Sequence, residues 1–265
     1  MSKTLPTFFI PHGGGPCFFM DWNPAGAWDN MRTFLEGFVR DLPERPKSLL
    51  IVTAHWETKT PTVSTNPQPD LLFDYHGFPD HTYDLTWPAP GDPVLAHKVV
   101  DLLERAGILT ETDDTRGFDH GVFIPMKVAV PDADIPTVML SIRQDLDPEF
   151  HIRLGKALRP LRDQGVLIVG SGLSYHNIGA LMGRSTPRGA AEFDDWLTKA
   201  ATAAPERREK MLPKWQDAPG ARFAHPREDH LVPVFVAAGA ASGEQGVKVY
   251  DDTVLGARVS AFRFG

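Results

Sequence analysis

Cysteine, basic charge and long apolar runs are scarce in this sequence of 265 residues. Its single cysteine, Cys17, excludes an internal disulfide and a cysteine-rich zinc site. The net charge is −7 and the one dense basic run, Arg207–Lys210, carries its own acid, so we expect no nucleic-acid partner. No stretch approaches the roughly 20 apolar residues of a membrane span, and the first residues lack the apolar core of a signal peptide. A cytoplasmic protein with no membrane partner is the expectation.

Short β-like runs alternate with helical patterns along the chain. This alternation predicts an α/β fold, with one domain over residues 1–265 and a mostly parallel or mixed central sheet flanked by helices. Runs such as Leu49–Val52 are apolar throughout, which is typical of strands buried on both faces. The predicted strands are Thr7–Ile10, Ser48–Thr53, Thr137–Ser141, Val166–Gly170, Val247–Tyr250 and Arg258–Phe264. The predicted helices are Ala25–Asp41, Asp92–Ala106, Glu149–Asp163, Ala190–Ala204 and Leu231–Ala241.

A proline-rich segment from Pro61 to Pro93 shows no clear periodicity and is predicted to be a long loop. It contains DYHGFPDHTYDLTWPAPGDP, which is dense in aromatic and turn-forming residues. Such a loop could form the floor of a pocket for a flat ligand. A packed surface loop is the equally weighted alternative.

Three of the ten histidines follow or end predicted strands. His12 comes just after Thr7–Ile10, His55 ends SLLIVTAHW, and His176 follows VLIVGSG. Open α/β sheets place their ligands at the carboxyl ends of the strands, and parallel strands bring those ends to one edge. A single histidine is more often structural than functional, but three in equivalent positions favour a shared site.

Two more segments add candidate ligands. RGFDHGVF contains His120, and HPREDHLVP contains His225 and His230 together with the carboxylates of Glu228 and Asp229. Imidazole and carboxylate ligands suit Zn, Fe, Mn or Cu, and an incomplete set of protein ligands leaves coordination positions for a substrate. These residues therefore extend the predicted metal site.

The other histidines receive structural interpretations. His97 and His151 lie within helical patterns and are predicted to be on the surface, while His76 and His81 belong to the aromatic loop and have no assigned role. Cys17 is expected to be a small buried packing residue, since no second cysteine is available to bind zinc with it.

Seven motifs, in their order and spacing, resemble those of the class III extradiol ring-opening dioxygenases. Their closest likeness is to the DOPA 4,5-dioxygenase-type branch, which is related to the catalytic subunit of protocatechuate 4,5-dioxygenase. Each motif alone is weak, but together they cover the chain from about His12 to Val236. The motifs are PHGGGPCFFMDW, TAHWET, YDLTWPAPGDPVLA, RGFDHGVFIPM, PDADIPTVMLSI, GSGLSYHN and HPREDHLVP.

The resemblance implies a non-haem Fe(II) centre at the carboxyl edge of the sheet, with zinc as an alternative bound metal. By position, His12 and His55 match the first two metal ligands of the family. The third falls on His230 in this branch, and Glu228 is the alternative because it would complete a two-histidine, one-carboxylate triad. His176 matches the acid–base histidine, with a near-neutral pKa, and is a fourth ligand in some zinc-loaded relatives.

The resemblance also assigns residues around the metal. His120 matches a second catalytic histidine of the pocket, acting on substrate or oxygen. His225 would orient the neighbouring ligand, and the glycines at 13–15 would leave room for catechol and O2. The implied reaction opens the ring of a small aromatic diol with both atoms of O2 to give a muconic semialdehyde.

Two other functions remain open at this point. A zinc-dependent hydrolase could use the same pocket to activate water, and a binding module could keep the fold without the chemistry. The substrate is unspecified, although Arg116, Arg143 and Lys127 are candidates for pairing with a substrate carboxylate. A homo-oligomer is compatible with the sequence.

Overall fold

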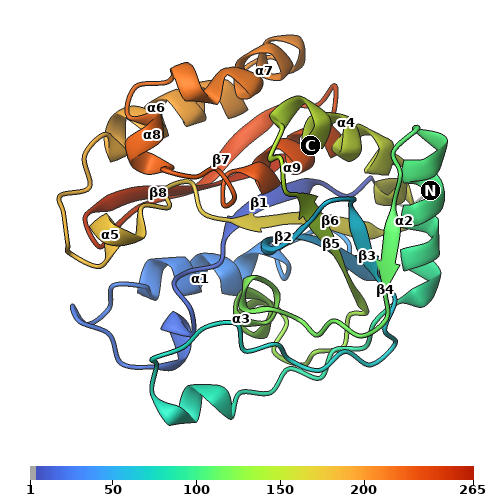
Figure 1. Cartoon of the computed structure of the whole chain (residues 1–265), viewed down its shortest axis with the longest axis horizontal. Helices are drawn as coiled ribbons and strands as arrows, with labels where there is room; N and C mark the ends of the chain where they lie inside the picture. The colour runs from blue at the N-terminus through green and yellow to red at the C-terminus, as the bar shows by residue number, and fades with distance from the viewer. Residues whose placement is uncertain (1–3) are drawn as a thin grey trace.

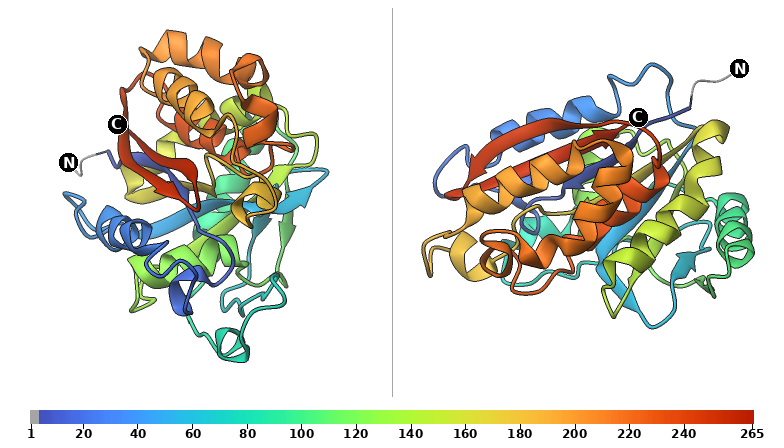
Figure 2. Two further views of the ribbon diagram at one scale, coloured as in Figure 1. Left: turned by 90° about the vertical axis from the view of Figure 1, so that its left-hand side faces the viewer. Right: turned by 90° about the horizontal axis from the view of Figure 1, so that it is seen from above.

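The computed structural model describes residues 4–265 and is built around an eight-stranded mixed sheet with helices on both faces (Figures 1 and 2). The strand order is β4-β3-β5-β2-β6-β1-β8-β7. This arrangement confirms the predicted α/β fold. The strands are β1 (Thr7–Pro11), β2 (Ser48–Thr58), β3 (Thr62–Ser64), β4 (Glu111–Asp113), β5 (Thr137–Arg143), β6 (Val166–Gly172), β7 (Gly246–Val254) and β8 (Ala257–Phe264).

Helices α1 and α3 cover one face of the sheet, and α2, α4, α6 and α9 lie on the other (Figure 1). The α-helices are α1 (Asp29–Phe38), α2 (Pro93–Arg105), α3 (His120–Ala129), α4 (Pro148–Leu158), α5 (Ile178–Leu181), α6 (Ala190–Ala201), α7 (Pro205–Met211), α8 (Ala221–Ala224) and α9 (Val232–Ala240). The 3-10 turns are η1 (Cys17–Phe19), η2 (Asp80–Tyr83), η3 (Arg159–Gln164) and η4 (Leu212–Asp217). Over residues 4–265, no helix has both the length and the apolar character needed to cross a bilayer.

The central strands β5, β2, β6 and β1 run parallel to one another, and nearly all of their residues are buried. Burial on both faces explains why their sequences are continuously apolar rather than alternating. Strand β6 lies between β1 and β2, so the chain segments that leave these three strands start side by side. This order brings the predicted histidine positions to one edge.

Two predicted helices differ from the observed ones. The pattern at 25–41 forms only the shorter α1, and the pattern at 149–163 divides into α4 and the 3-10 turn η3. In the second case Pro160 lies where the α-helix gives way to the turn, since proline cannot donate the backbone hydrogen bond that would continue it.

Helix α3 was not predicted from the sequence. Nine of its ten residues are buried, so the segment is apolar on every side and lacks the 3.6-residue periodicity of a surface helix. It also contains Pro125. The short elements α5, α7, α8, β3 and β4 were missed as well.

The long segment between Pro61 and Pro93 contains β3 and the 3-10 turn η2 but is otherwise without regular structure. Its aromatic residues pack mainly against one another and against α3. The ring of Phe73 lies 5.4 Å from that of Phe123, and Tyr75 lies 5.5 Å from Phe78. The loop is therefore well packed, which agrees with the structural alternative for this segment.

The expectation that His151 lies on the surface is wrong, whereas His97 is exposed and Cys17 is buried as predicted. The His151 side chain is inaccessible to solvent and links two chain segments. Its Nδ1 donates to the backbone oxygen of Asp147 at 2.6 Å, and its Nε2 accepts from the backbone N–H of Arg143 at 3.0 Å. Burial, the largest cause, lowers the pKa of His151 to about 4. A helical pattern in the sequence does not show whether a histidine lies on the buried or the exposed face of the helix. His151 lies on the buried face.

We expect His151→Gln to lower the free energy of unfolding by about 1–3 kcal/mol at pH 7.5, because the histidine hydrogen bonds are lost. As the pH falls below 6.5 the unfolded wild-type chain takes up a proton at this site that the folded chain accepts only near pH 4. The wild type therefore loses stability that the variant does not lose, and the difference between their free energies of unfolding becomes smaller. Urea unfolding at pH 7.5 and pH 5 measures this.

The matched control is His97→Gln on the exposed surface of α2, which we expect to change stability by less than about 0.5 kcal/mol at either pH. If the difference in free energy of unfolding between wild type and His151→Gln were the same at pH 7.5 and pH 5, the assignment of a neutral buried imidazole would be contradicted.

Candidate metal centre

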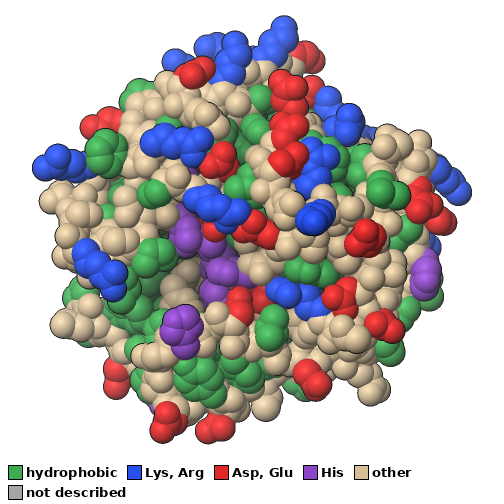
Figure 3. Space-filling model, in the orientation of Figure 1, with side chains coloured by type: hydrophobic (Ala, Val, Ile, Leu, Met, Phe, Trp, Pro, Cys, Tyr) green, Lys and Arg blue, Asp and Glu red, His purple; other side chains and the backbone are tan. Residues whose placement is uncertain are grey.

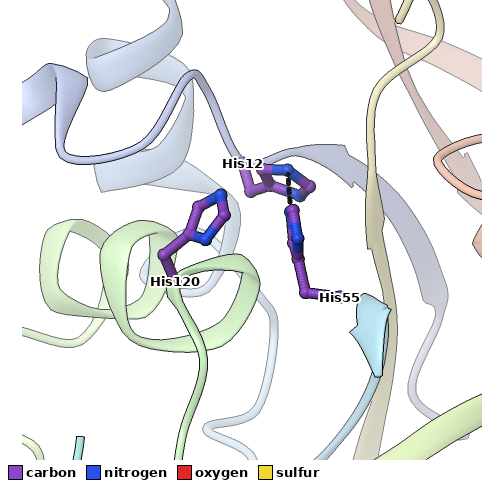
Figure 4. Close-up of side chains that lie close together, drawn as sticks. All are labelled: His12, His55 and His120. Atoms are coloured by element: carbon purple, nitrogen blue, oxygen red, sulfur yellow. Dashed lines mark hydrogen bonds between the residues drawn. The ribbon is translucent and has the colours of Figure 1, made fainter. Parts of the chain in front are cut away.

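Three histidines far apart in sequence converge at the carboxyl edge of the sheet. His12 directly follows β1, His55 lies near the end of β2, and His230 lies just before α9. Figure 4 shows His12 and His55 directed toward each other, with His120 beside them. The Nε2 atom of His55 lies 3.1 Å from Nε2 of His12 and 3.2 Å from Nε2 of His230.

Glycine in β6 allows the segment carrying His230 to lie directly against the sheet. A Cβ atom on Gly172 would come within 2.1 Å of the backbone oxygen of His230. That oxygen accepts a hydrogen bond from the backbone N–H of Leu173 at 3.0 Å. Since no side chain fits between the two backbones, Gly172 is needed to place His230.

Hydrogen bonds around His12 determine which of its nitrogens carries the proton. Its Nδ1 lies 3.2 Å from Oγ of Ser171, and the hydroxyl proton of Ser171 is donated to the backbone oxygen of Gly121. The Ser171 oxygen must therefore accept, so Nδ1 of His12 is the donor. This leaves the lone pair of His12 on Nε2, directed toward His55.

His230 is held in the same tautomer by a carboxylate. Its Nδ1 lies 2.9 Å from Oδ2 of Asp229. Burial raises the pKa of Asp229 to about 6, so this carboxyl group is still mostly ionised at neutral pH and acts as an acceptor. The Nε2 lone pair of His230 therefore also points toward His55.

The imidazoles of His12, His55 and His230 are neutral at pH 7. Burial is the largest cause that lowers their pKa values, and the nearby charges of other histidines, including His120 and His176, lower them further. The lone pairs on Nε2 of His12 and His230 both face Nε2 of His55, and neutral imidazole nitrogens are ligands for a cation. The site therefore has the electrostatic character of a cation-binding centre.

The spacing of these nitrogens fits a transition metal. A metal bound at about 2.0–2.1 Å from each nitrogen, with bond angles of roughly 100–110°, separates the nitrogens by about 3.1–3.4 Å. The observed separations of 3.1 and 3.2 Å fall in this range. Imidazole ligands suit Fe, Zn and Cu, and three protein ligands leave positions for other groups.

His120 is the first residue of α3 and lies beside the three convergent histidines. Its ring centroid is 3.8 Å from that of His55 and 5.5 Å from that of His12. Nitrogen atoms of His12, His55 and His120 lie within 4.8 Å of one another. The structure therefore places His120 beside His12 and His55.

His176 follows β6 and stacks on His230. The two ring centroids are 3.3 Å apart and the planes differ by 13°. His176, Asp229 and His230 form a second group whose ligand atoms lie within 4.8 Å of one another. Burial, followed by the charges of His225 and His120, lowers the pKa of His176 to about 3. The near-neutral pKa expected for His176 is therefore not found, and the ring is neutral at pH 7.

His225 and Glu228 lie next to the site but contact other groups. His225 is fully buried, and its Nε2 donates to the backbone oxygen of Ser174 at 2.9 Å. Glu228 pairs with Arg222 at 2.7 Å. The carboxylate in contact with the His230 ring is Asp229, so the structure offers Asp229 as the group that orients this ring.

The glycines of PHGGGPC serve the backbone turn. Gly13 and Gly15 have φ values of +87° and +55°. A Cβ on Gly13 would meet Cys17 at 2.4 Å, and one on Gly15 would meet Phe78 at 2.8 Å. Their side-chain directions are thus occupied by protein atoms, and the expected role of leaving room for catechol and O2 does not fit these two positions.

The three cations considered as substrate anchors all have protein partners. Arg116 donates at 3.1 Å to both the backbone oxygen of His55 and the carboxylate of Asp119. Arg143 is paired with Asp145 at 2.6 Å, and Lys127 donates to the backbone oxygen of Thr86 at 2.6 Å. Figure 3 shows histidine side chains inside a hollow, with acidic and basic groups nearby.

Two residues of the site were not found from the sequence. Ser171 lies within the strand β6, and Asp74 lies in the aromatic loop, where its carboxylate contacts His120 at 2.7 Å. Serine and aspartate are common in strands and loops, and neither position carries a local signal of its partner. Only the folded arrangement identifies them.

Several relatives of this chain are named as dioxygenases. A dioxygenase, tasH, of Hapsidospora irregularis is 35% identical, and the match covers 98% of this chain and 85% of that protein. A 4,5-DOPA dioxygenase extradiol of Beta vulgaris is 39% identical over 89% of this chain and 86% of its own length. An enzyme of the same name from Escherichia coli is 31% identical over 94% of this chain and 90% of its own length.

A solved structure has the same fold. The crystal structure of an uncharacterized protein from Escherichia coli K12 matches 98% of this chain and 99% of that chain, with a TM-score of 0.78 and 28% sequence identity. The family model described as the catalytic LigB subunit of aromatic ring-opening dioxygenase matches residues 6–261. Together with the histidine cluster, this match shows that the chain belongs to the LigB family of metal-dependent aromatic ring-opening dioxygenases.

Proposed function

We propose that the protein is a non-haem Fe(II)-dependent extradiol dioxygenase that opens the ring of a catechol-type aromatic. Both atoms of O2 enter the product, a muconic semialdehyde. The observation that carries this proposal is the convergence of three neutral imidazoles, with inward Nε2 atoms 3.1 and 3.2 Å apart, in a chain of this family. His12, His55 and His230 are the proposed ligands.

A bound Fe(II) would supply a Lewis acid that lowers the pKa of a catechol hydroxyl and a redox centre for reaction with O2. The protein supplies proton acceptors beside it. The ring of His176 stacks on that of the proposed ligand His230, with centroids 3.3 Å apart, and this position makes it the proposed acceptor of the second hydroxyl proton. His120, whose ring centroid lies 3.8 Å from that of His55, is the second proposed acid–base group.

Anaerobic reconstitution with Fe(II) and a panel of catechols tests the activity. Because several relatives carry the name 4,5-DOPA dioxygenase extradiol, DOPA belongs in the panel beside catechols without the amino-acid side chain. We expect one O2 to be consumed per catechol, with a yellow product, as measured with an oxygen electrode and by absorbance.

The zinc-loaded protein is the comparison in this experiment. Zinc has no redox chemistry, so it should support no oxygen uptake. Hydrolysis of an ester or amide by the zinc form, together with no oxygen uptake by the iron form on any catechol, would contradict the proposal and favour a hydrolase.

The ligand set is tested by metal content. We expect His12→Ala, His55→Ala and His230→Ala each to lose bound metal, since each removes one of three imidazole ligands. Glu228→Gln is the matched control: its side chain is paired with Arg222, so metal content should be unchanged. Equilibrium dialysis with elemental analysis measures this, and loss of metal from Glu228→Gln but not from His230→Ala would make Glu228 the third ligand.

The proton-transfer role is tested separately with His176→Ala. This variant should keep its metal and lose about 10²–10⁴ in turnover, the usual contribution of general acid–base catalysis. Steady-state oxygen uptake is the measurement, with His97→Ala as a control on a distant exposed residue. Near-normal turnover in His176→Ala would show that this histidine transfers no proton in the rate-limiting step.

A further inference from the structure

The carboxylate of Asp74 contacts two histidines of the proposed catalytic site. Its Oδ1 accepts a hydrogen bond from Nδ1 of His120 at 2.7 Å, and its Oδ2 lies 3.6 Å from Nδ1 of His55. The Asp74 side chain is only 20% exposed, so these interactions are weakly screened by solvent. Asp74 is the carboxylate that contacts the His120 ring.

Asp74 also holds the backbone at the start of α3. Its Oδ1 accepts from the backbone N–H of His120, the first residue of that helix, at 2.9 Å. Asp119, the residue at the N-cap position, makes no capping hydrogen bond with its side chain, which instead accepts from Thr53 and Arg116. Asp74 therefore takes the capping role, and both the backbone and the ring of His120 are fixed by the same oxygen.

The loop that carries Asp74 is joined to the segment before α3. Backbone hydrogen bonds connect Leu72 N–H to the oxygen of Phe118 at 2.7 Å and Phe118 N–H to the oxygen of Asp70 at 2.8 Å. On the other side of Asp74, the Tyr75 hydroxyl donates to the backbone oxygen of Thr82 at 2.6 Å. Asp74 is thus held in place before any substrate binds.

This geometry determines the tautomer of His120. An ionised carboxylate only accepts hydrogen bonds, so the ring must present its proton on Nδ1. In the neutral ring the lone pair then lies on Nε2, the nitrogen that does not contact Asp74. A ring without this partner could rotate or adopt the other tautomer, and its accepting nitrogen would be lost from the site.

We propose that Asp74 is a positioning residue of the ring-opening reaction, which holds His120 in the Nδ1–H tautomer with Nε2 available to substrate. The inference rests on the proposed function, because it assigns how one of its acid–base groups is oriented. Asp74 itself touches no substrate and acts through His120. The aromatic loop therefore contributes to catalysis through this one carboxylate as well as through packing.

The first test needs no variant at Asp74. In the zinc-loaded protein labelled with 15N-histidine, we expect His120 to show a protonated Nδ1 and an unprotonated Nε2 in long-range 1H–15N spectra. The His120→Gln variant identifies the signal by its loss. An Nε2–H tautomer of His120 in the wild type would overturn the proposal.

The second test compares Asp74→Ala with Asp84→Ala, which makes the same chemical change at an exposed position of the same loop. Alanine is chosen because the oxygen of an asparagine could still accept both His120 hydrogen bonds. In Asp74→Ala we expect the His120 signal to shift toward the Nε2–H tautomer and kcat for a catechol to fall by about 10²-fold or more. KM should change by less than about threefold, and saturating zinc should still bind stoichiometrically. Asp84→Ala should match the wild type in each measurement.

The outcomes separate this inference from the proposed function. A kcat for Asp74→Ala within threefold of that for Asp84→Ala, with an unchanged His120 tautomer, would overturn the positioning role. If the iron-loaded wild type turned over no catechol at all, the proposed function would fail, and the dependence of the His120 tautomer on Asp74 would still decide whether this carboxylate positions the ring.

Discussion

The site depends on the convergence of three neutral imidazoles that the fold brings together. His12 and His230 each have Nδ1 engaged as a donor, to Ser171 and to Asp229, so their Nε2 lone pairs face His55. Convergent imidazole nitrogens are a ligand set for a cation. The groups around the histidines fix tautomers that leave the Nε2 atoms of His12 and His230 free to bind a metal.

The topology of the sheet explains how this arrangement is reached. The histidines come from strands or loops at one edge, where β1, β6 and β2 lie in adjacent positions. The groups that orient them come from three segments: β6 with Ser171, the turn before α9 with Asp229, and the aromatic loop with Asp74. The orientation of the histidines therefore depends in part on contacts between residues far apart in the sequence.

Much of the fold and several residues of the candidate site could be predicted, because apolar strands and the motifs around His12, His55 and His230 are local features of the sequence. The continuous apolar runs of β2 and β6 indicated strands buried on both faces, and the observed sheet confirms this. The failures have a common cause. The burial of His151 and the uniform burial of α3 depend on the elements that pack around them. Hydrophobic periodicity along the sequence does not identify those neighbouring elements.

The sequence by itself determined the longer strands, the class of fold and the histidines available for a site, because residue type and spacing act over short distances. The tertiary structure alone decided which nitrogen of His12, His120 and His230 carries a proton and which group accepts it. Asp74 and His120 are 46 residues apart, and His12 and Ser171 are 159 apart. Hydrogen bonds at such separations depend on the packing of the sheet and its loops, and no local pattern encodes them.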